Sequence, residues 1–210
     1  DLCNTKDEVK KIEKTLMDNG FSVKAYLGSK GNAESFVALN GKSPSIVHIA
    51  THGFYYTPDE AKDKDFLSGY TDAMSLSGLV FAGGNAAWLG KKNVDGVLGG
   101  VLTAKDIANL DFKGTDLLVL SACKTGQGKV TAEGVFGLQR AFKKAGVGTI
   151  IMSLWNVDDK VTSEFMVAFY EQLTDKANNW NKRKAFEQTK EIIRKKHPDP
   201  YYWAAFVMLD

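Results

Sequence analysis

A cysteine and a histidine, each placed shortly after an apolar segment, could together form a nucleophilic site. Cys123 follows the apolar residues 117–120, and His52 follows the apolar residues 46–50. A cysteine thiol is reactive as the thiolate, and a neighbouring imidazole can promote that ionisation and later protonate a leaving amine. The two residues are therefore candidates for the nucleophile and the general acid–base of a hydrolase.

The glycine beside the histidine adds a second feature of such a site. Gly53 has no side chain, so a substrate carbonyl can approach the backbone at this position. The backbone N–H groups of Gly53 and Cys123 could then donate to the oxyanion that forms during acyl transfer. A lone cysteine at a strand end is more often a packing residue, and a lone histidine is more often structural, so spacing alone leaves both interpretations open.

The candidate pair depends on a parallel sheet to bring it together. Residues 46–50 and 117–120 are short apolar runs typical of strands, and 117–120 has the continuous apolar pattern of a central strand covered on both faces. Functional groups collect at the carboxyl ends of such strands. If the two strands are neighbours, the 71 residues that separate His52 from Cys123 are no obstacle to contact.

The remaining pattern alternates between helices and strands, which predicts an α/β sandwich with a largely parallel central sheet and helices on both faces. Helices are expected at 5–19, 32–39, 103–110, 131–145, 158–173 and 179–196, and further strands at 21–27, 78–82, 149–154 and 202–209. Thr5 with Glu8, and Thr103 with Asp106, stand at the spacing of helix-capping residues. Residues 55–69 and 83–100 are expected as loops.

The composition of the chain excludes several classes of protein. The chain has 210 residues, 44% of them hydrophobic and 25% charged, with a net charge of +2, which excludes a disordered chain and gives no reason to expect nucleic-acid or membrane contact. Two cysteines are too few for a disulfide framework, so a reducing, cytoplasmic location is expected. The start lacks both a methionine and a signal peptide, so we expect a piece cut from a longer protein. The strand–helix series continues to Leu209, so a single domain, 1–210, is expected.

Several motifs resemble one family in order along the chain. VHIATHGF at 47–54 and LVLSACKTG at 118–126 resemble the His and Cys boxes of CHAT domains, which are caspase-like cysteine peptidases of the group that includes separase, gingipains and metacaspases. Residues 133–138, 141–146, 153–159 and 202–206 are similar to later segments of the same family. One departure is Lys124, where the family commonly has glutamate.

The resemblance implies a caspase-like three-layer sandwich and cleavage of a protein or peptide through an acyl-enzyme. His52 would be the general acid–base, Cys123 the nucleophile, and the amides of Gly53 and Cys123 the oxyanion donors. No metal or cofactor is implied. A larger bacterial protein, with an upstream helical-repeat region or a regulatory partner, is expected from the resemblance alone.

Substrate preference has two open interpretations. In separase-like relatives an aspartate of the Trp-x-Val-x-Asp segment selects arginine before the scissile bond. Here that segment places Trp155, Asp158 and Asp159 as substrate-binding candidates, and a carboxylate at a pocket rim would pair with arginine or lysine. Both aspartates also precede a helix, where capping favours Asp.

Two other functions stay open. The chain could be a catalytically silent CHAT-like module for protein–protein interaction, or a hydrolase of small thioesters or amides. The other histidines are weaker candidates: His48 is expected to be packed and hydrogen-bonded, and His197 to lie at an exposed helix end. No zinc-type spacing is present. The basic stretch 176–196 is expected as a solvated face or a contact for an acidic partner domain.

Overall fold

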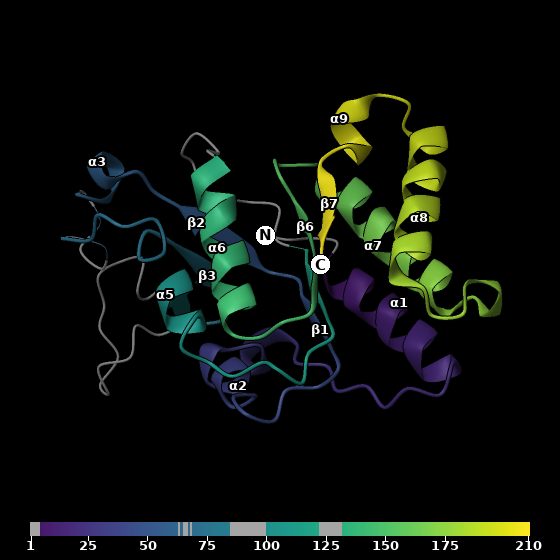
Figure 1. Ribbon diagram of the computed structural model, residues 1–210, viewed down its shortest axis with the longest axis horizontal. Helices are drawn as coiled ribbons and strands as arrows, with labels where there is room; N and C mark the ends of the chain where they lie inside the picture. Colours follow the sequence, from purple (N-terminus) through teal and green to yellow (C-terminus); the bar gives the residue numbers. More distant parts are fainter. Residues whose placement is uncertain (1–4, 63, 65–66, 68, 85–99, 122–131) are drawn as a thin grey trace.

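The computed structural model describes residues 5–62, 64, 67, 69–84, 100–121 and 132–210. Its centre is a sheet in the order β1–β5–β6–β7, with helices on both sides (Figure 1). The strands are β1 (Ile46–Ile49), β5 (Leu117–Leu120), β6 (Thr149–Ser153) and β7 (Phe206–Leu209). β1, β5 and β6 are parallel, and β7 is antiparallel to β6. This architecture confirms the predicted caspase-like sandwich with a largely parallel sheet.

Alternating residues of the strands supply two separate cores, because successive side chains point to opposite faces of a sheet. On one face, Leu118 and Leu120 of β5 pack with three helices, α2 (Ala33–Val37), α5 (Ala104–Ile107) and α6 (Ala132–Lys144). On the other face, Leu117 and Val119 pack with α1 (Thr5–Asp18), α7 (Asp159–Thr174) and α8 (Lys182–Lys196). All four residues of β5 are buried, as predicted for a central strand.

A second, antiparallel sheet contains β2 (His52–Tyr55), β3 (Ser77–Val80) and β4 (Val101–Thr103) in that order. Phe54 and Val101 belong to its own buried cluster. The helix α6 lies close to β3 at Gly137, where an added Cβ would come within 2.3 Å of the Ser77 hydroxyl oxygen. This close approach explains why the helix carries a glycine at that position.

Shorter elements complete the chain: η1 (Gly28–Lys30), α3 (Pro58–Ala61), η2 (Lys176–Asn178) and α9 (Pro200–Trp203). The capping box of Thr103 and Asp106 is present, as predicted. The box predicted for Thr5 and Glu8 is not: Thr5 is the first helical residue of α1, and the Glu8 side chain is buried against His48.

Three sequence-based predictions of strands and loops were wrong. Residues 21–27 form no strand, since Phe21 instead stacks on Trp180 with ring centroids 4.6 Å apart. No strand was predicted between residues 50 and 78, but His52–Tyr55 form β2, and the predicted loop at 55–69 contains the short helix α3. The terminal segment is divided between α9 and β7, because Asp199 caps a helical turn with Pro200 at its first position. Most of the predicted loop at 83–100 lies outside the described residues.

Candidate active site

The strands that precede the two candidate residues are direct neighbours. β1 and β5 pair in parallel, with Ile49 opposite Leu120, and the N–H of Ser121 donates to the Ile49 carbonyl at 2.8 Å. Both strands therefore end at the same edge of the central sheet. Cys123 is in the segment 122–131, which lies outside the described residues.

His52 begins the second sheet three residues after β1 ends. It is half-buried and stands opposite Val80 in the antiparallel pair of β2 with β3. The preceding Thr51 hydroxyl donates to the Val80 carbonyl, which anchors the short connection between the two sheets. His52 thus sits where the chain passes from one sheet to the other, three residues beyond the end of β1, the strand that pairs with β5.

The orientation of the Gly53 amide follows from the phase of the β2–β3 ladder. Beyond the strand ends, the Tyr56 N–H donates to the Leu76 carbonyl at 2.9 Å, in the same register that places Gly53 opposite Leu79. Hydrogen-bonded and non-hydrogen-bonded pairs alternate in an antiparallel ladder. Counting back from Tyr56, Gly53 falls in a non-hydrogen-bonded pair, so its N–H is directed away from β3.

The substrate-binding candidates lie in and after the loop that follows β6, the strand next to β5. The Trp155 indole N–H donates to the Tyr201 carbonyl at 3.0 Å, and the Tyr201 hydroxyl donates to the Asn156 carbonyl at 2.6 Å. These two hydrogen bonds hold the loop against α9. Trp155 is half-buried as a result.

The two aspartates differ in their roles at α7. Asp158 is the N-cap, and its side chain accepts from the N–H groups of Lys160 and Val161 at 2.9 and 3.2 Å. This bears out the capping interpretation for Asp158. Asp159 is the first residue of the helix and is half-buried.

His48 is packed and hydrogen-bonded, as predicted. Its Nε2 lies 2.9 Å from Oε1 of Glu8, and the Tyr170 hydroxyl lies 3.4 Å from its Nδ1. Sequence reasoning assigned Glu8 to a helix cap and missed this contact. The spacing held a signal, because Glu8 stands four residues before Ile12 and eight before Leu16, on the buried face of α1.

His197 ends α8, as predicted, but it is less exposed than expected. Its Nε2 lies 2.9 Å from Oε2 of Glu164 on α7, at the same distance as Nζ of Lys196, and its side chain is 24% exposed. Burial by itself raises the pKa of Glu164, but the hydrogen bonds from His197 and Lys196 outweigh it and hold that pKa below its ordinary value.

This lowered pKa predicts a loss of stability in acid. The unfolded chain has the higher Glu164 pKa, about 4.3, so the stabilising contribution is present above that pH and is lost as the pH falls through the folded pKa. Glu164→Gln should therefore lose less stability than the wild type between pH 5 and pH 3, measured by urea unfolding. Glu191→Gln, which alters a carboxylate that is 54% exposed, is the control and should keep the wild-type slope. Equal slopes for the wild type and Glu164→Gln would contradict this account.

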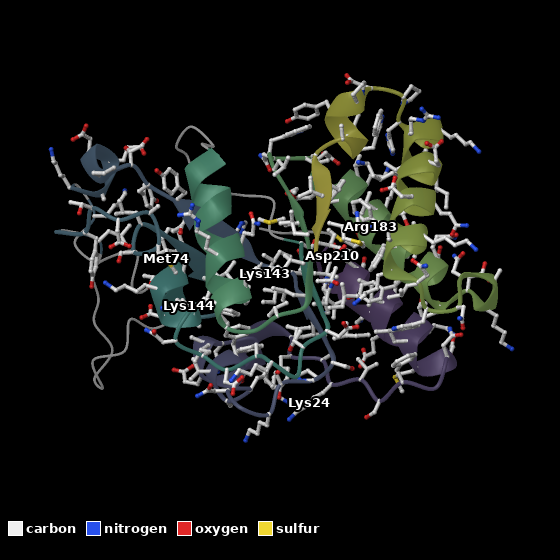
Figure 2. The ribbon with its side chains drawn as sticks, in the orientation of Figure 1. Lys24, Met74, Lys143, Lys144, Arg183 and Asp210 are labelled. Atoms are coloured by element: carbon white, nitrogen blue, oxygen red, sulfur yellow. The ribbon has the colours of Figure 1, made fainter. Side chains whose placement is uncertain are left out.

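Many basic side chains of 176–196 have acidic partners within the domain. Figure 2 shows Arg183 beside Asp210, with which it forms an ion pair. Among the described residues, further pairs join Lys182 with Asp116, Arg194 with Glu191, and Lys196 with Glu164. Much of the positive charge of this stretch is therefore balanced locally.

Within the described ranges, no three His, Cys, Asp or Glu side chains come close enough together to hold a metal ion. None of the helices in those same ranges combines the length and apolar character that a membrane crossing requires.

Comparison with known proteins gives one family and two curated relatives. The family model of the CHAT domain matches residues 1–210. The chain is 32% identical over 111 residues to human (Homo sapiens) tetratricopeptide repeat protein 28 and 31% identical over 111 residues to the mouse (Mus musculus) protein of the same name. Each match covers 52% of this chain but only 4% of the relative.

Proposed function

The chain belongs to the CHAT domain family, and from that premise we propose that it is a cysteine endopeptidase domain in which His52 and Cys123 form the catalytic dyad. The observation that carries the proposal is the parallel pairing of β1 with β5. Ile49 and Leu120 stand opposite each other, and His52 and Cys123 each follow three residues later. Two short connections of equal length thus lead from one edge of the sheet to the two reactive residues.

In the proposed reaction, His52 takes the proton of the Cys123 thiol, and the sulfur attacks the carbonyl carbon of the scissile peptide bond. The resulting tetrahedral intermediate collapses as the carbon–nitrogen bond breaks, and His52 donates its proton to the leaving amine. Water, deprotonated by His52, then attacks the thioester carbonyl. This step releases the acid and restores the thiol.

The oxyanion of both intermediates would accept hydrogen bonds from the backbone amides of Gly53 and Cys123. The ladder phase supports the first donor, because the Gly53 N–H is directed away from β3. Gly53 is also buried, so little water competes for the oxyanion there. Removal of one such donor from other hydrolases lowers kcat by about 100- to 1000-fold.

Asp159 is our candidate for substrate recognition. Asp158 already accepts two backbone hydrogen bonds as the cap of α7, whereas Asp159 adds a second carboxylate at the same helix start. A carboxylate at this position, beside the loop that carries Trp155, would pair with an arginine or lysine before the scissile bond.

The preference can be tested with fluorogenic peptides that differ only in the residue before the scissile bond. We expect arginine and lysine peptides to be cleaved fastest, and Asp159→Asn to lower kcat/KM for them by about tenfold or more, because a charge-assisted hydrogen bond is lost. Asp158→Asn is the matched control, since asparagine also caps helices and should leave the preference intact. Fastest cleavage after aspartate or an apolar residue would refute the basic preference.

The tetratricopeptide repeats named in the relatives support a further part of the proposal. We propose that the domain acts within a longer chain, whose helical repeats bring a protein substrate or an activator to it. Cleavage of peptides by the wild-type protein, lost in Cys123→Ala, is the direct test of the enzymatic function.

A further inference from the structure

A buried polar cluster joins a strand of the central sheet to two helices that pack on one of its faces. It consists of Glu8 on α1, His48 on β1 and Tyr170 on α7. The side chains of Glu8 and His48 are 3% and 11% exposed, and Tyr170 is fully buried. Among the described residues, Glu8 is the one charged side chain that belongs to the buried set.

One arrangement of protons satisfies the whole cluster. Burial raises the pKa of the Tyr170 hydroxyl, and the negative charge of Glu8 raises it further, so Tyr170 keeps its proton and can direct it at Nδ1 of His48, which lies 3.4 Å away. Nε2 of His48 then carries the imidazole proton and donates to Glu8 at 2.9 Å. The histidine thereby connects the N-terminal helix to α7 through two directional contacts.

Burying such a polar cluster costs free energy, so packing of the helix alone does not explain it. A buried carboxylate loses its hydration, and apolar residues of similar size often give equal or greater stability. Apolar contact is non-directional, however, and it tolerates sliding of a strand along its axis. Hydrogen bonds require a defined distance and angle, so they resist that sliding.

The hydrogen-bonded pairing with β5 restrains the strand that carries His48 along one side, and the cluster adds a restraint from α1 and α7. β1 is four residues long and lies at the edge of its sheet, where β5 is its neighbour in the strand order. The chain leaves the sheet after Ile49 and reaches His52 three residues later. A shift of β1 along its axis would therefore move His52 relative to the end of β5.

We propose that Glu8 and His48 are positioning residues, which fix β1 along its axis and thereby place His52. This inference rests on the proposed catalytic role of His52. Loss of the cluster should lower kcat by about 10- to 100-fold through misplacement of the acid–base, with KM little changed.

The test separates positioning from simple support of the fold. Glu8→Leu removes the acceptor and leaves His48 unpaired, whereas Glu8→Gln keeps an oxygen acceptor of the same size and is the conservative rescue. Glu8→Leu/His48→Leu replaces the pair by apolar side chains, and its melting temperature should rise above that of Glu8→Leu, because no buried imidazole is left without its partner. The Tyr170 hydroxyl loses its acceptor in both the double variant and His48→Leu, which is therefore the matched control for that loss. We expect kcat to stay low in this double variant and to be restored in Glu8→Gln.

The second readout does not depend on peptide cleavage. In Cys123→Ser protein, the titration of the His52 imidazole is followed by NMR, with and without the double leucine replacement. A changed His52 titration in a double variant that is folded at the temperature of the measurement supports positioning. An unchanged titration overturns it, as does wild-type kcat in the double variant. Absence of cleavage by the wild type would count against the proposed peptidase activity, while the NMR comparison would still decide the role of the cluster.

Discussion

Replacing Cys123 or His52 with alanine is expected to lower kcat/KM for peptide cleavage by about a thousandfold or more. Cys123→Ala removes the atom that bonds to the substrate carbonyl. His52→Ala removes the group that would generate the thiolate and protonate the leaving amine. Because the two act as a unit, the double variant should be no less active than either single variant.

The controls for these variants follow from where the residues stand. The pairing of β1 with β5 ends at Ile49 and Leu120, before either residue, and His52 pairs with Val80 through backbone that alanine keeps. Neither substitution should therefore change the circular dichroism spectrum or unfold the domain. Cys3→Ser is the matched control for the thiol, and we expect it to retain full activity. Turnover by a folded Cys123→Ala or His52→Ala variant would refute the dyad.

Phe165→Ala is expected to be the most destabilising of the substitutions considered, with a loss of about 3–5 kcal/mol in the free energy of unfolding. Phe165 on α7 is fully buried. Its ring stacks on Phe206 of β7 with centroids 3.8 Å apart, and it meets Phe186 of α8 edge-on at 5.7 Å. One side chain thus joins the central sheet to two helices, and alanine would leave a cavity among all three.

Phe21→Ala is the matched control for this loss. It makes the same chemical change, and Phe21 also stacks on another aromatic ring, that of Trp180. Phe21 is 37% exposed, however, so its removal opens no enclosed cavity and should cost only about 1 kcal/mol. Urea unfolding of both variants provides the comparison, and equal losses would contradict the assignment of Phe165 to the core.

The central sheet could be predicted because its strands are short runs of apolar residues, which are visible in the sequence itself. The four apolar residues 117–120 require burial on both faces, and β5 lies between β1 and β6 with all four side chains buried. The candidate pair requires that the strands before His52 and Cys123 be neighbours, as the α/β fold class allows. The structure confirms this, because β1 pairs with β5.

Other features depend on contacts that no local pattern contains. Residues 21–27 have the alternating apolar and polar pattern of a strand. Phe21, however, stacks on Trp180, a residue distant in the sequence. Glu8 stands at a capping position by spacing, but the burial of His48 and Tyr170 decides its partner. β2 was missed because its strand character comes from pairing with β3, whose first residue, Ser77, stands 22 positions after Tyr55.

The most direct test of the account is covalent labelling with a peptidyl electrophile that carries arginine at the reactive end. Intact-mass and peptide mass spectrometry should show one adduct per chain, located on Cys123, and the rate of labelling should fall sharply in His52→Ala. Labelling of Cys3 alone, or labelling of Cys123 at the same rate with and without His52, would contradict the proposal that these two residues form the catalytic dyad.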